Sequence, residues 1–283
     1  MRALLCASPD RPATALILDD VRRVVADHAE IVAEVNADSA ALSSNLVFDR
    51  VVAVGGDGTL IAQVRRVLDR GIPLVGVNSG RLGFLAEFDL SSLEKQAASV
   101  FGRNPLIRQR LVMDVMVKRR DGTVVFHGIA INDAVVTSGL PFRMIELQLE
   151  FSGAPGPDVA GDGILIASPL GSTAYNVSAG GPIVHPDVEA LIVTPICPHS
   201  LGFRPIVVPS HLDIAVHVQR ANEGTTLVLD GQTNVRLSVG DCVQVGRHQS
   251  MARLVGNAEV TYWQQLLSKM RWAAPPSYRD RGV

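Results

Sequence analysis

Hydrophobic and polar positions alternate between two periodicities over the first hundred residues. Continuous apolar runs of four to six residues are typical of strands buried on both faces. Between them, apolar side chains recur at spacings of three and four, as on one face of an amphipathic helix. The pattern predicts strands at Arg2–Ala7, Glu30–Val35, Val51–Val54 and Pro73–Asn78, and helices at Ala13–Asp27, Thr59–Leu68 and Ser91–Val100. Strands that alternate with helices favour a parallel, doubly wound sheet.

The pattern changes after Pro105. From Arg110 onward the chain reads as short β-like segments separated by Gly, Pro and Asn, with Asp121-Gly122 as a hairpin signal. Near the end, Thr261–Trp272 becomes helical again. We therefore predict an α/β N-terminal domain over residues 1–107, with a doubly wound and mostly parallel sheet, and an all-β, sandwich-like domain over residues 108–250. Residues 276–283 are expected to form a frayed tail.

Composition limits the classes of protein that fit this pattern. The 283 residues are 47% hydrophobic and 19% charged, which is typical of a globular chain and not of a disordered one. A net charge of −2 argues against a broad basic face for nucleic acid or an anionic membrane. The three cysteines follow no metal-binding spacing. The apolar run near the N-terminus is too short for a signal peptide. We expect a soluble, cytoplasmic protein without a nucleic-acid or membrane partner.

The stretch Gly55-Gly56-Asp57-Gly58-Thr59 follows a predicted buried strand and precedes a predicted helix. This is the position at which open parallel sheets bind ligands, and glycines let the backbone approach a phosphate closely. A carboxylate there is electrostatically awkward unless it binds Mg²⁺ or accepts a proton. A tight turn between strand and helix explains the same residues equally well. The glycine spacing fits neither the P-loop nor the dinucleotide-binding fingerprint.

A second polar segment extends from Gly161 to Pro186, "GDGILIASPLGSTAYNVSAGGPIVHP". Hydroxyl groups among small residues suit recognition of a polar, planar ligand such as adenine or a ribose. A long loop of this composition inside a compact β domain is more often functional than not. The tripeptide Ile131-Asn132-Asp133, placed at the end of a predicted strand, and the tetrapeptide Leu229–Gln232 are weak signals in isolation.

Taken in order, these segments resemble the NAD kinase family. The resemblance rests on "GGDGT", "NSGRLGFLAEF" (Asn78–Phe88), "IND", the Gly161–Pro186 segment, "PICPHSLGFRPIVVP" and "DGQ". It implies an α/β domain followed by an all-β domain, with the chain returning to the first domain at about residues 251–275. It also implies transfer of a phosphoryl group from ATP, or from polyphosphate, to the adenosine-ribose 2′-hydroxyl of NAD.

The same resemblance implies roles for individual residues. Asp57 would be the catalytic acid–base residue, and Arg143 would match a basic contact position. Contacts with the substrates are implied for Gly55, Gly56, Asp57, Gly58, Thr59, Asn132, Asp133, Arg143, Asp162, Thr173, Ala174, Tyr175, Asn176, Val177, Ser178 and Gln232. Two residues depart from the family pattern: Leu170 stands where Thr or Ser is usual, and Gly202 stands where Ser is usual. These departures bear on substrate preference.

The resemblance further implies Mg²⁺ held mainly by phosphates, with any metal-ligating residues left unassigned, and a homo-oligomer, a dimer or tetramer. Two other readings of the sequence remain. A lipid kinase shares "GGDGT" but would need an apolar or membrane-seeking surface. A non-catalytic dinucleotide sensor could keep the Thr173–Ser178 segment but would have no use for Asp57.

Overall fold

The computed structural model describes residues 1–38, 42–43, 45–80 and 83–272, and these form two compact units. Unit 1 contains Met1–Arg66, Ile72–Arg108 and the described residues from Arg253 onward. Unit 2 contains Gln109–Ala252 together with the short segment Val67–Gly71. The predicted tail at residues 276–283 lies outside the described residues.

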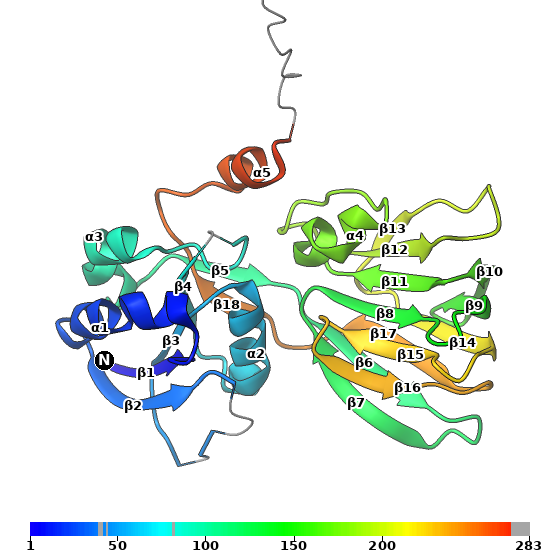
Figure 1. The fold of residues 1–283 in the computed structure, drawn as a ribbon, viewed down its shortest axis with the longest axis horizontal. Coiled ribbons are helices and arrows are strands. Elements are labelled where there is room, and N and C mark those ends of the chain that lie inside the picture. The colour runs from blue at the N-terminus through cyan, green and yellow to red at the C-terminus, as the bar shows by residue number, and fades with distance from the viewer. Residues whose placement is uncertain (39–41, 44, 81–82, 273–283) are drawn as a thin grey trace, which may run out of the picture. The chain divides into compact units, whose positions relative to one another are not determined.

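Unit 1 is built on a parallel sheet, as the alternating pattern predicts (Figure 1). Its strand order among the described residues is β2-β1-β3-β4-β18-β5. The strands are β1 (Arg2–Ala7), β2 (Glu30–Asn36), β3 (Arg50–Val54), β4 (Leu74–Val77), β5 (Ile107–Arg110) and β18 (Ala252–Val255). The helices are α1 (Pro12–Ala26), α2 (Asp57–Val67), α3 (Leu90–Val100) and α5 (Tyr262–Met270). The predicted strands and helices are confirmed, with ends that differ by one or two residues.

Helices cover both faces of this sheet. Val75 and Val77 of β4 share a core cluster with the apolar stripes of α1 and α3. Gly76, between them, faces the other way because side chains alternate along a strand, and Leu60 of α2 packs against it. The central strands are therefore buried on both faces, which explains why β3 reads as a continuous apolar run.

The end of the chain returns to unit 1. Strand β18 pairs in parallel with β4, with Leu254 opposite Leu74, and lies between β4 and β5 in the sheet. Helix α5 follows as a separate segment (Figure 1). Residues 273–275, which the resemblance also assigns to this return, are outside the described residues.

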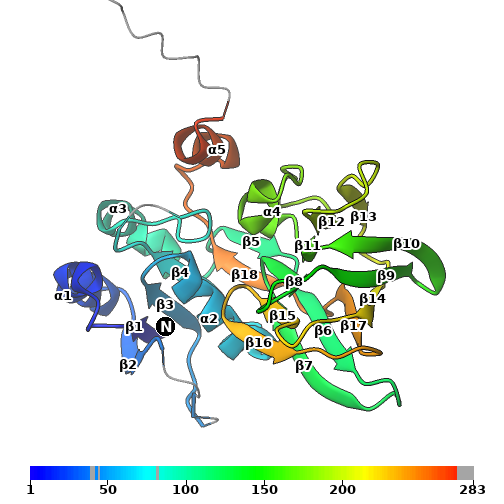
Figure 2. The same cartoon turned by 45° about the vertical axis from the view of Figure 1, so that its right-hand side comes forward.

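Unit 2 consists of two antiparallel sheets, which Figure 2 shows in green to orange. Their orders in the described chain are β10-β9-β14-β17-β6-β7 and β13-β12-β11-β8-β15-β16. The first sheet holds β6 (Met113–Lys118), β7 (Val124–Ala130), β9 (Ile145–Phe151), β10 (Ala154–Gly161), β14 (Ile214–Arg220) and β17 (Cys242–Arg247). The second holds β8 (Asp133–Thr137), β11 (Gly163–Ala167), β12 (Ala190–Ile196), β13 (Ile206–Pro209), β15 (Thr226–Leu229) and β16 (Thr233–Arg236).

One hydrophobic core joins these two sheets. Val115 and Leu147 of the first sheet share it with Ile164 and Leu191 of the second, and all four are fully buried. Alternate residues of β6 and β9 face this core and the others are partly exposed, as expected for sheets with one covered face. The predicted sandwich-like all-β domain is confirmed, and Asp121-Gly122 does form a turn, with φ 86° at Gly122.

One local prediction about a site residue is wrong and another is confirmed. Helix α2 begins at Asp57 and not at Thr59, so the acid lies in the first helical turn, where the helix dipole favours a negative charge. Asn132 lies between β7 and β8, and Asp133 is the first residue of β8. Ile131 directly follows the end of β7, so the predicted place of the tripeptide at the end of a strand is confirmed, and Asp133 also begins the next strand.

Candidate functional site

The Gly55–Thr59 segment connects β3 to α2 in unit 1. The Gly55 N–H donates to Val77 O at 2.8 Å, which ties the loop to the carboxyl end of β4. Gly56 and Gly58 are exposed, Asp57 is half-buried and Thr59 is 8% exposed. The predicted loop therefore lies at the carboxyl ends of parallel strands, with Gly55 buried and Gly56 and Gly58 accessible.

Asp57 is held by a second loop of the same unit. Phe84 N–H donates to Oδ2 at 2.8 Å, and the N–H groups of Leu85 and Ala86 donate to Oδ1 at 3.1 Å each. Three donors on one side chain suit an ionised carboxylate, which only accepts hydrogen bonds. Asp57 thus joins the "GGDGT" loop to the segment that the resemblance singles out as Asn78–Phe88, of which residues 81 and 82 are outside the described residues.

Gly83 makes this arrangement possible. A Cβ at this position would lie 2.7 Å from Asp57 Oδ2 and closer still to Oδ1. No side chain fits there without moving the carboxylate. The glycine is needed for a close approach and not for turn geometry.

In unit 2, Asp230 organises the Ile131–Asp133 segment. Its carboxylate accepts from the backbone N–H of Ile131, Asn132 and Asp133 at 2.7–3.1 Å. Asp230 has a left-handed φ of 48° and Gly231 a φ of 65°, as in hairpin turns between strands such as β15 and β16. Sequence reasoning missed Asp230. The available signal was an Asp-Gly pair, which also marks any ordinary hairpin.

The Ser168–Gly171 segment packs directly on Asn132. Ser168 N–H donates to Asn132 O at 2.9 Å, and Ser168 Oγ donates to Ile131 O at 2.6 Å. Ser168 Oγ also accepts from Gly171 N–H at 3.1 Å. A Cβ on Gly171 would lie 2.6 Å from Asn132 Cα. The structure therefore brings the predicted "IND" and "GSTAY" segments together, about 40 residues apart in the sequence.

The two polar side chains of "IND" differ in their surroundings. Both backbone polar groups of Asn132 are used, but its amide makes no hydrogen bond within the described residues. Asp133 is 6% exposed. Burial, with a smaller contribution from the nearby negative charge of Asp230, raises the pKa of Asp133 to about 7. An unpaired amide beside a buried carboxyl group can supply hydrogen bonds to a polar ligand.

The predicted Thr173–Ser178 residues continue from Gly171 through a 3₁₀ turn (Leu170–Thr173) into the short helix α4 (Tyr175–Ser178). Tyr175 is 46% exposed, Ser178 is exposed, and Thr173, Ala174 and Val177 are partly exposed. They follow shortly after Gly171, whose backbone packs against Asn132. This is the longest continuous stretch of predicted contact residues in unit 2.

Asn176 differs from these neighbours because it is fully buried. Its Nδ2 donates to Ser172 O at 3.1 Å and to Pro182 O at 2.9 Å, and Thr194 Oγ1 donates to its Oδ1 at 2.7 Å. These partners use both donor positions of the amide. The side chain of Asn176 therefore joins Ser172 and Pro182 of this loop to Thr194 of β12.

Asp162 lies at the other end of β11 from this cluster. The register pairs Gly163 with Thr137 and Ala167 with Asp133, so the five residues of β11 separate Asp162 from Asn132. Asn132 lies opposite Ser168, six residue steps from Asp162, and at about 3.3 Å per residue this distance is roughly 20 Å. Asp162 is exposed, and Gln232 lies on the exposed turn after Asp230. The structure does not bring Asp162 to the Asn132 cluster within one chain.

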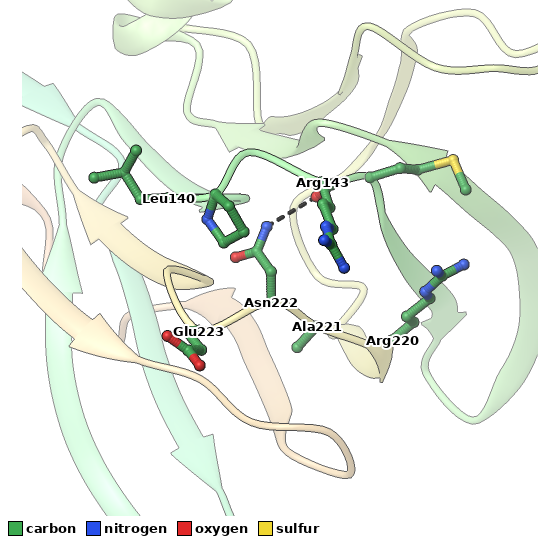
Figure 3. Close-up of a pocket in the computed structure, with 8 residues that line it drawn as sticks. Leu140, Arg143, Arg220, Ala221, Asn222 and Glu223 are labelled. Atoms are coloured by element: carbon green, nitrogen blue, oxygen red, sulfur yellow. Dashed lines mark hydrogen bonds between the residues drawn. The ribbon is translucent and has the colours of Figure 1, made fainter.

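Arg143 lines a separate pocket of unit 2 (Figure 3). The pocket has a volume of about 620 Å³, and its lining includes Arg220, Asn222 and Glu223. Asn222 Nδ2 donates to Arg143 O at 2.8 Å, as the dashed line in Figure 3 shows. The guanidinium of Arg143 makes no hydrogen bond or ion pair within the described residues.

Three further observations concern metals, membranes and cysteines. Among the residues that the structure describes, no three His, Cys, Asp or Glu side chains gather as they would around a metal ion. No described helix has both the length and the apolar character needed to span a membrane. Cys6 is buried, Cys242 is partly buried and Cys197 is exposed.

A family model matches each of the two units. Residues 21–104 match the ATP-NAD kinase N-terminal domain, and residues 131–256 match the ATP-NAD kinase C-terminal domain. The two matches together cover most of the chain. They follow the division into an α/β unit and an all-β unit.

Individual proteins support the same family. The chain is 39% identical to an NAD kinase from Geobacter metallireducens over 79% of each chain. It is 40% identical to an NAD kinase from Trichlorobacter lovleyi over 78% of each chain. A third, from Magnetococcus marinus, is 37% identical over 80% of this chain and 74% of its own.

Two solved structures have a similar fold. A yeast NADH kinase complexed with NADH superposes with a TM-score of 0.86 at 24% identity, over 100% of this chain and 90% of its own. An NAD kinase from Archaeoglobus fulgidus in complex with ATP gives a TM-score of 0.74 at 28% identity, over 96% of this chain and 99% of its own. At 24% identity, the first comparison concerns the fold alone.

Proposed function

The chain belongs to the ATP-NAD kinase family and is a kinase that acts on NAD, and from this premise we propose that Asp57 activates the acceptor hydroxyl. The reaction proposed is transfer of the γ-phosphoryl group of ATP to the adenosine-ribose 2′-hydroxyl of NAD, which gives NADP. The observation that carries the role of Asp57 is its fixed carboxylate at the "GGDGT" loop.

The hydrogen bonds of Asp57 leave room for this role. A carboxylate offers about four acceptor positions, and backbone N–H groups use three of them. The remaining position can accept a ribose hydroxyl. A base held rigidly before the substrate arrives needs little reorganisation during the reaction, and phosphoryl transfer depends mainly on positioning and charge. Asp57 would take up the proton of the 2′-hydroxyl or orient that hydroxyl toward the phosphorus atom.

Unit 2 supplies the groups that we assign to nucleotide binding. The unpaired amide of Asn132 can donate and accept at adenine or ribose, and Asp133 beside it can hydrogen-bond a ribose hydroxyl. Tyr175 offers an aromatic face, and Thr173 and Ser178 offer hydroxyl groups on the adjoining surface. Gln232 and Arg143 are further contacts in this proposal.

ATP is the phosphoryl donor of the family, and polyphosphate is the alternative donor to test. Mg²⁺ on the donor phosphates would supply positive charge against the negative charge that develops in the transition state. The described residues fit an ion held chiefly by those phosphates, because Asp57 is the only carboxylate of the "GGDGT" loop and its oxygens already accept three hydrogen bonds.

A homo-oligomer, a dimer or tetramer, is part of the proposal. Asp162 is about 20 Å, six residue steps along β11, from Asn132 in the same chain. A contact between Asp162 and NAD is more readily made at the site of a neighbouring copy. Sedimentation of the purified chain tests this assembly directly.

We also place the protein in the cytoplasm. The support is the cysteine content: Cys6, Cys197 and Cys242 are all free thiols, as is usual in a reducing compartment.

The decisive test is Asp57→Asn, because Asn keeps the shape and removes the charge. Turnover measured with an NADP-specific dehydrogenase should fall by about 10²–10⁴. The affinity for NAD should change by less than about twofold, since the lost function acts in the transition state. Asp69→Asn, an exposed acid beyond the same helix, is the matched control and should keep full turnover.

Other outcomes point to other roles. Recovery of Asp57→Asn by excess Mg²⁺ would assign the carboxylate to the metal. Near-normal turnover would reduce Asp57 to a turn residue and overturn the proposal. NAD binding without NADP formation by the unmodified chain would favour a dinucleotide sensor, and phosphorylation of a lipid would favour the lipid kinase.

A further inference from the structure

Lys269 of α5 lies in unit 1 close to the loop that holds Asp57. Its Nζ is 4.6 Å from the centroid of the Phe84 ring, and the Phe84 N–H is one of the three donors to Asp57. The ammonium is excluded from solvent and has no hydrogen-bond partner among the described residues. Burial lowers the pKa of Lys269, and the negative charges of Asp57 and Glu87 oppose that change.

The position of α5 is set by a polar network at its start. Asn257, which is 2% exposed, accepts from Gln96 Nε2 at 2.7 Å and donates from Nδ2 to Glu87 O at 3.1 Å. Glu87 Oε2 accepts from Asn257 N–H at 2.8 Å. Arg108 pairs with Glu87 Oε1 at 3.1 Å and donates to Val260 O at 2.8 Å. The segment before α5 is therefore hydrogen-bonded to Gln96 of α3 and to Glu87. Glu87 directly follows Ala86, the last of the three residues whose N–H groups donate to Asp57.

The helix itself has a well-defined start. Thr261 Oγ1 accepts from Gln264 N–H at 3.2 Å, and Gln264 Oε1 accepts from Thr261 N–H at 2.9 Å, which is a capping box. Gln265 and Leu266 are buried. The polar network and the capping box thus fix the start of α5. Lys269 follows about two turns later and lies over the Phe84 ring. Figure 2 shows α5 as the last helix of the chain.

A buried ammonium without an acceptor is unusual. It has three donors to satisfy, and a contact with an aromatic ring replaces only part of the lost hydration. The two nearby carboxylates already have other partners, because Asp57 accepts from the backbone and Glu87 pairs with Arg108 and Asn257. What is missing is an oxygen acceptor with negative charge.

We propose that Lys269 binds a phosphoryl oxygen of the donor nucleotide beside Asp57. The inference rests on the proposed function, in which the γ-phosphoryl group of ATP is transferred at this loop. A lysine ammonium binds phosphate as a point charge and gains from a site with little water. Lys269 would donate to the transferred phosphate, while Asp57 faces the acceptor hydroxyl.

A purely structural role makes a different prediction. If Lys269 only balances the charges of Asp57 and Glu87, its removal lowers stability and leaves ATP binding alone. Lys269→Met tests this because methionine keeps an apolar stem against the Phe84 ring. Lys269→Arg keeps the charge, and Lys95→Met removes an exposed lysine of α3 as the matched control.

We expect kcat/KM for ATP to fall about 10- to 100-fold in Lys269→Met, the effect of removing one hydrogen bond to a charged group. Calorimetry should show weaker ATP binding and an NAD affinity within about twofold of the wild type. Lys269→Arg should recover part of the loss. ATP affinity and kcat/KM in Lys269→Met equal to those of Lys95→Met would overturn the proposal. An effect on NAD alone would assign Lys269 to the acceptor and overturn it as well.

A second measurement does not depend on the folding of a variant. Adenosine triphosphopyridoxal carries an aldehyde at the end of its phosphate chain, which condenses with a nearby lysine amine with loss of water to give an imine. Added borohydride reduces the imine to a stable secondary amine. Peptide mapping of the wild-type chain should find the label on Lys269, and ATP should suppress it. Labelling elsewhere, or labelling that ATP does not suppress, would contradict the proposal. NADP formation by the wild-type chain in the same preparation separates this result from a failure of the proposed function.

Discussion

At the scale of single residues, Asp133 links stability to pH. Its pKa is raised to about 7 in the folded chain, chiefly by burial, against about 4 in an unfolded one. Between these values the folded state binds more protons than the unfolded state, so the free energy of unfolding decreases as pH rises. The contribution is fully present below pH 4 and is lost above about pH 7.

Asp133→Asn removes this dependence. The amide keeps the shape but has no charge to bury, so at pH 8 the variant should unfold at a higher temperature than the wild type. The gain is at most roughly 4 kcal/mol, from three pKa units. At pH 4 the two proteins should melt alike. Thermal melts at pH 4, 6 and 8 measure both effects, and equal melting at all three pH values would show that Asp133 ionises freely.

At the scale of elements, the Gly83–Ala86 segment and the start of α2 act as one piece because Asp57 joins them. Gly83→Ala places a methyl group against the Asp57 carboxylate and forces the side chain or the loop to move. We expect turnover to fall at least about tenfold, since a small displacement of a positioned group has large effects on rate. Steady-state assay of NADP formation is the measurement.

Gly80→Ala is the control for that prediction. It lies in the same segment, and an added Cβ there would meet only Asn78 Oδ1, at an ordinary 3.9 Å. Its turnover should be close to that of the wild type. Equal losses in both variants would mean that the segment tolerates no side chain anywhere, and the specific contact with Asp57 would lose its support.

At the scale of the whole molecule, the last segment of the chain completes unit 1. A chain that ends at residue 260 keeps β18 and loses α5. We expect it to fold with a KM for ATP raised about tenfold or more, because Lys269 is absent. A chain that ends at residue 251 also loses β18, whose Leu254 and Val255 are 6% and 3% exposed. Each such buried side chain contributes about 1.5–3 kcal/mol, so unit 1 should unfold at a clearly lower temperature.

Circular dichroism melts and limited proteolysis distinguish the two truncated chains. The longer one should resist protease at unit 1 as the full chain does. If the shorter one is equally resistant, β18 does not hold the sheet together. If the longer one uses ATP normally, α5 has no part in donor binding.

The sequence by itself determined the elements and the two-part organisation. An apolar run such as Val51–Val54, or an apolar stripe such as that of residues 13–27, is a pattern of neighbouring residues. It can therefore be recognised without the rest of the fold, and β3 and α1 form where these patterns predict. Asp121-Gly122 likewise specifies a turn from its own backbone preferences. The motifs of the Gly55–Thr59 and Gly161–Pro186 segments were also sufficient to indicate the family.

Tertiary structure alone decided which groups meet. Asp57 finds its donors at Phe84–Ala86, Asp230 finds the N–H groups of residues 131–133, and Lys269 reaches Phe84 across more than 180 residues. None of these partners is marked by periodicity, because a backbone N–H is the same at every residue. The separation of Asp162 from Asn132 follows from the register of β11 with β8, which depends on how the sandwich packs. Contacts between distant segments follow from packing, whereas local patterns predict only the elements that pack.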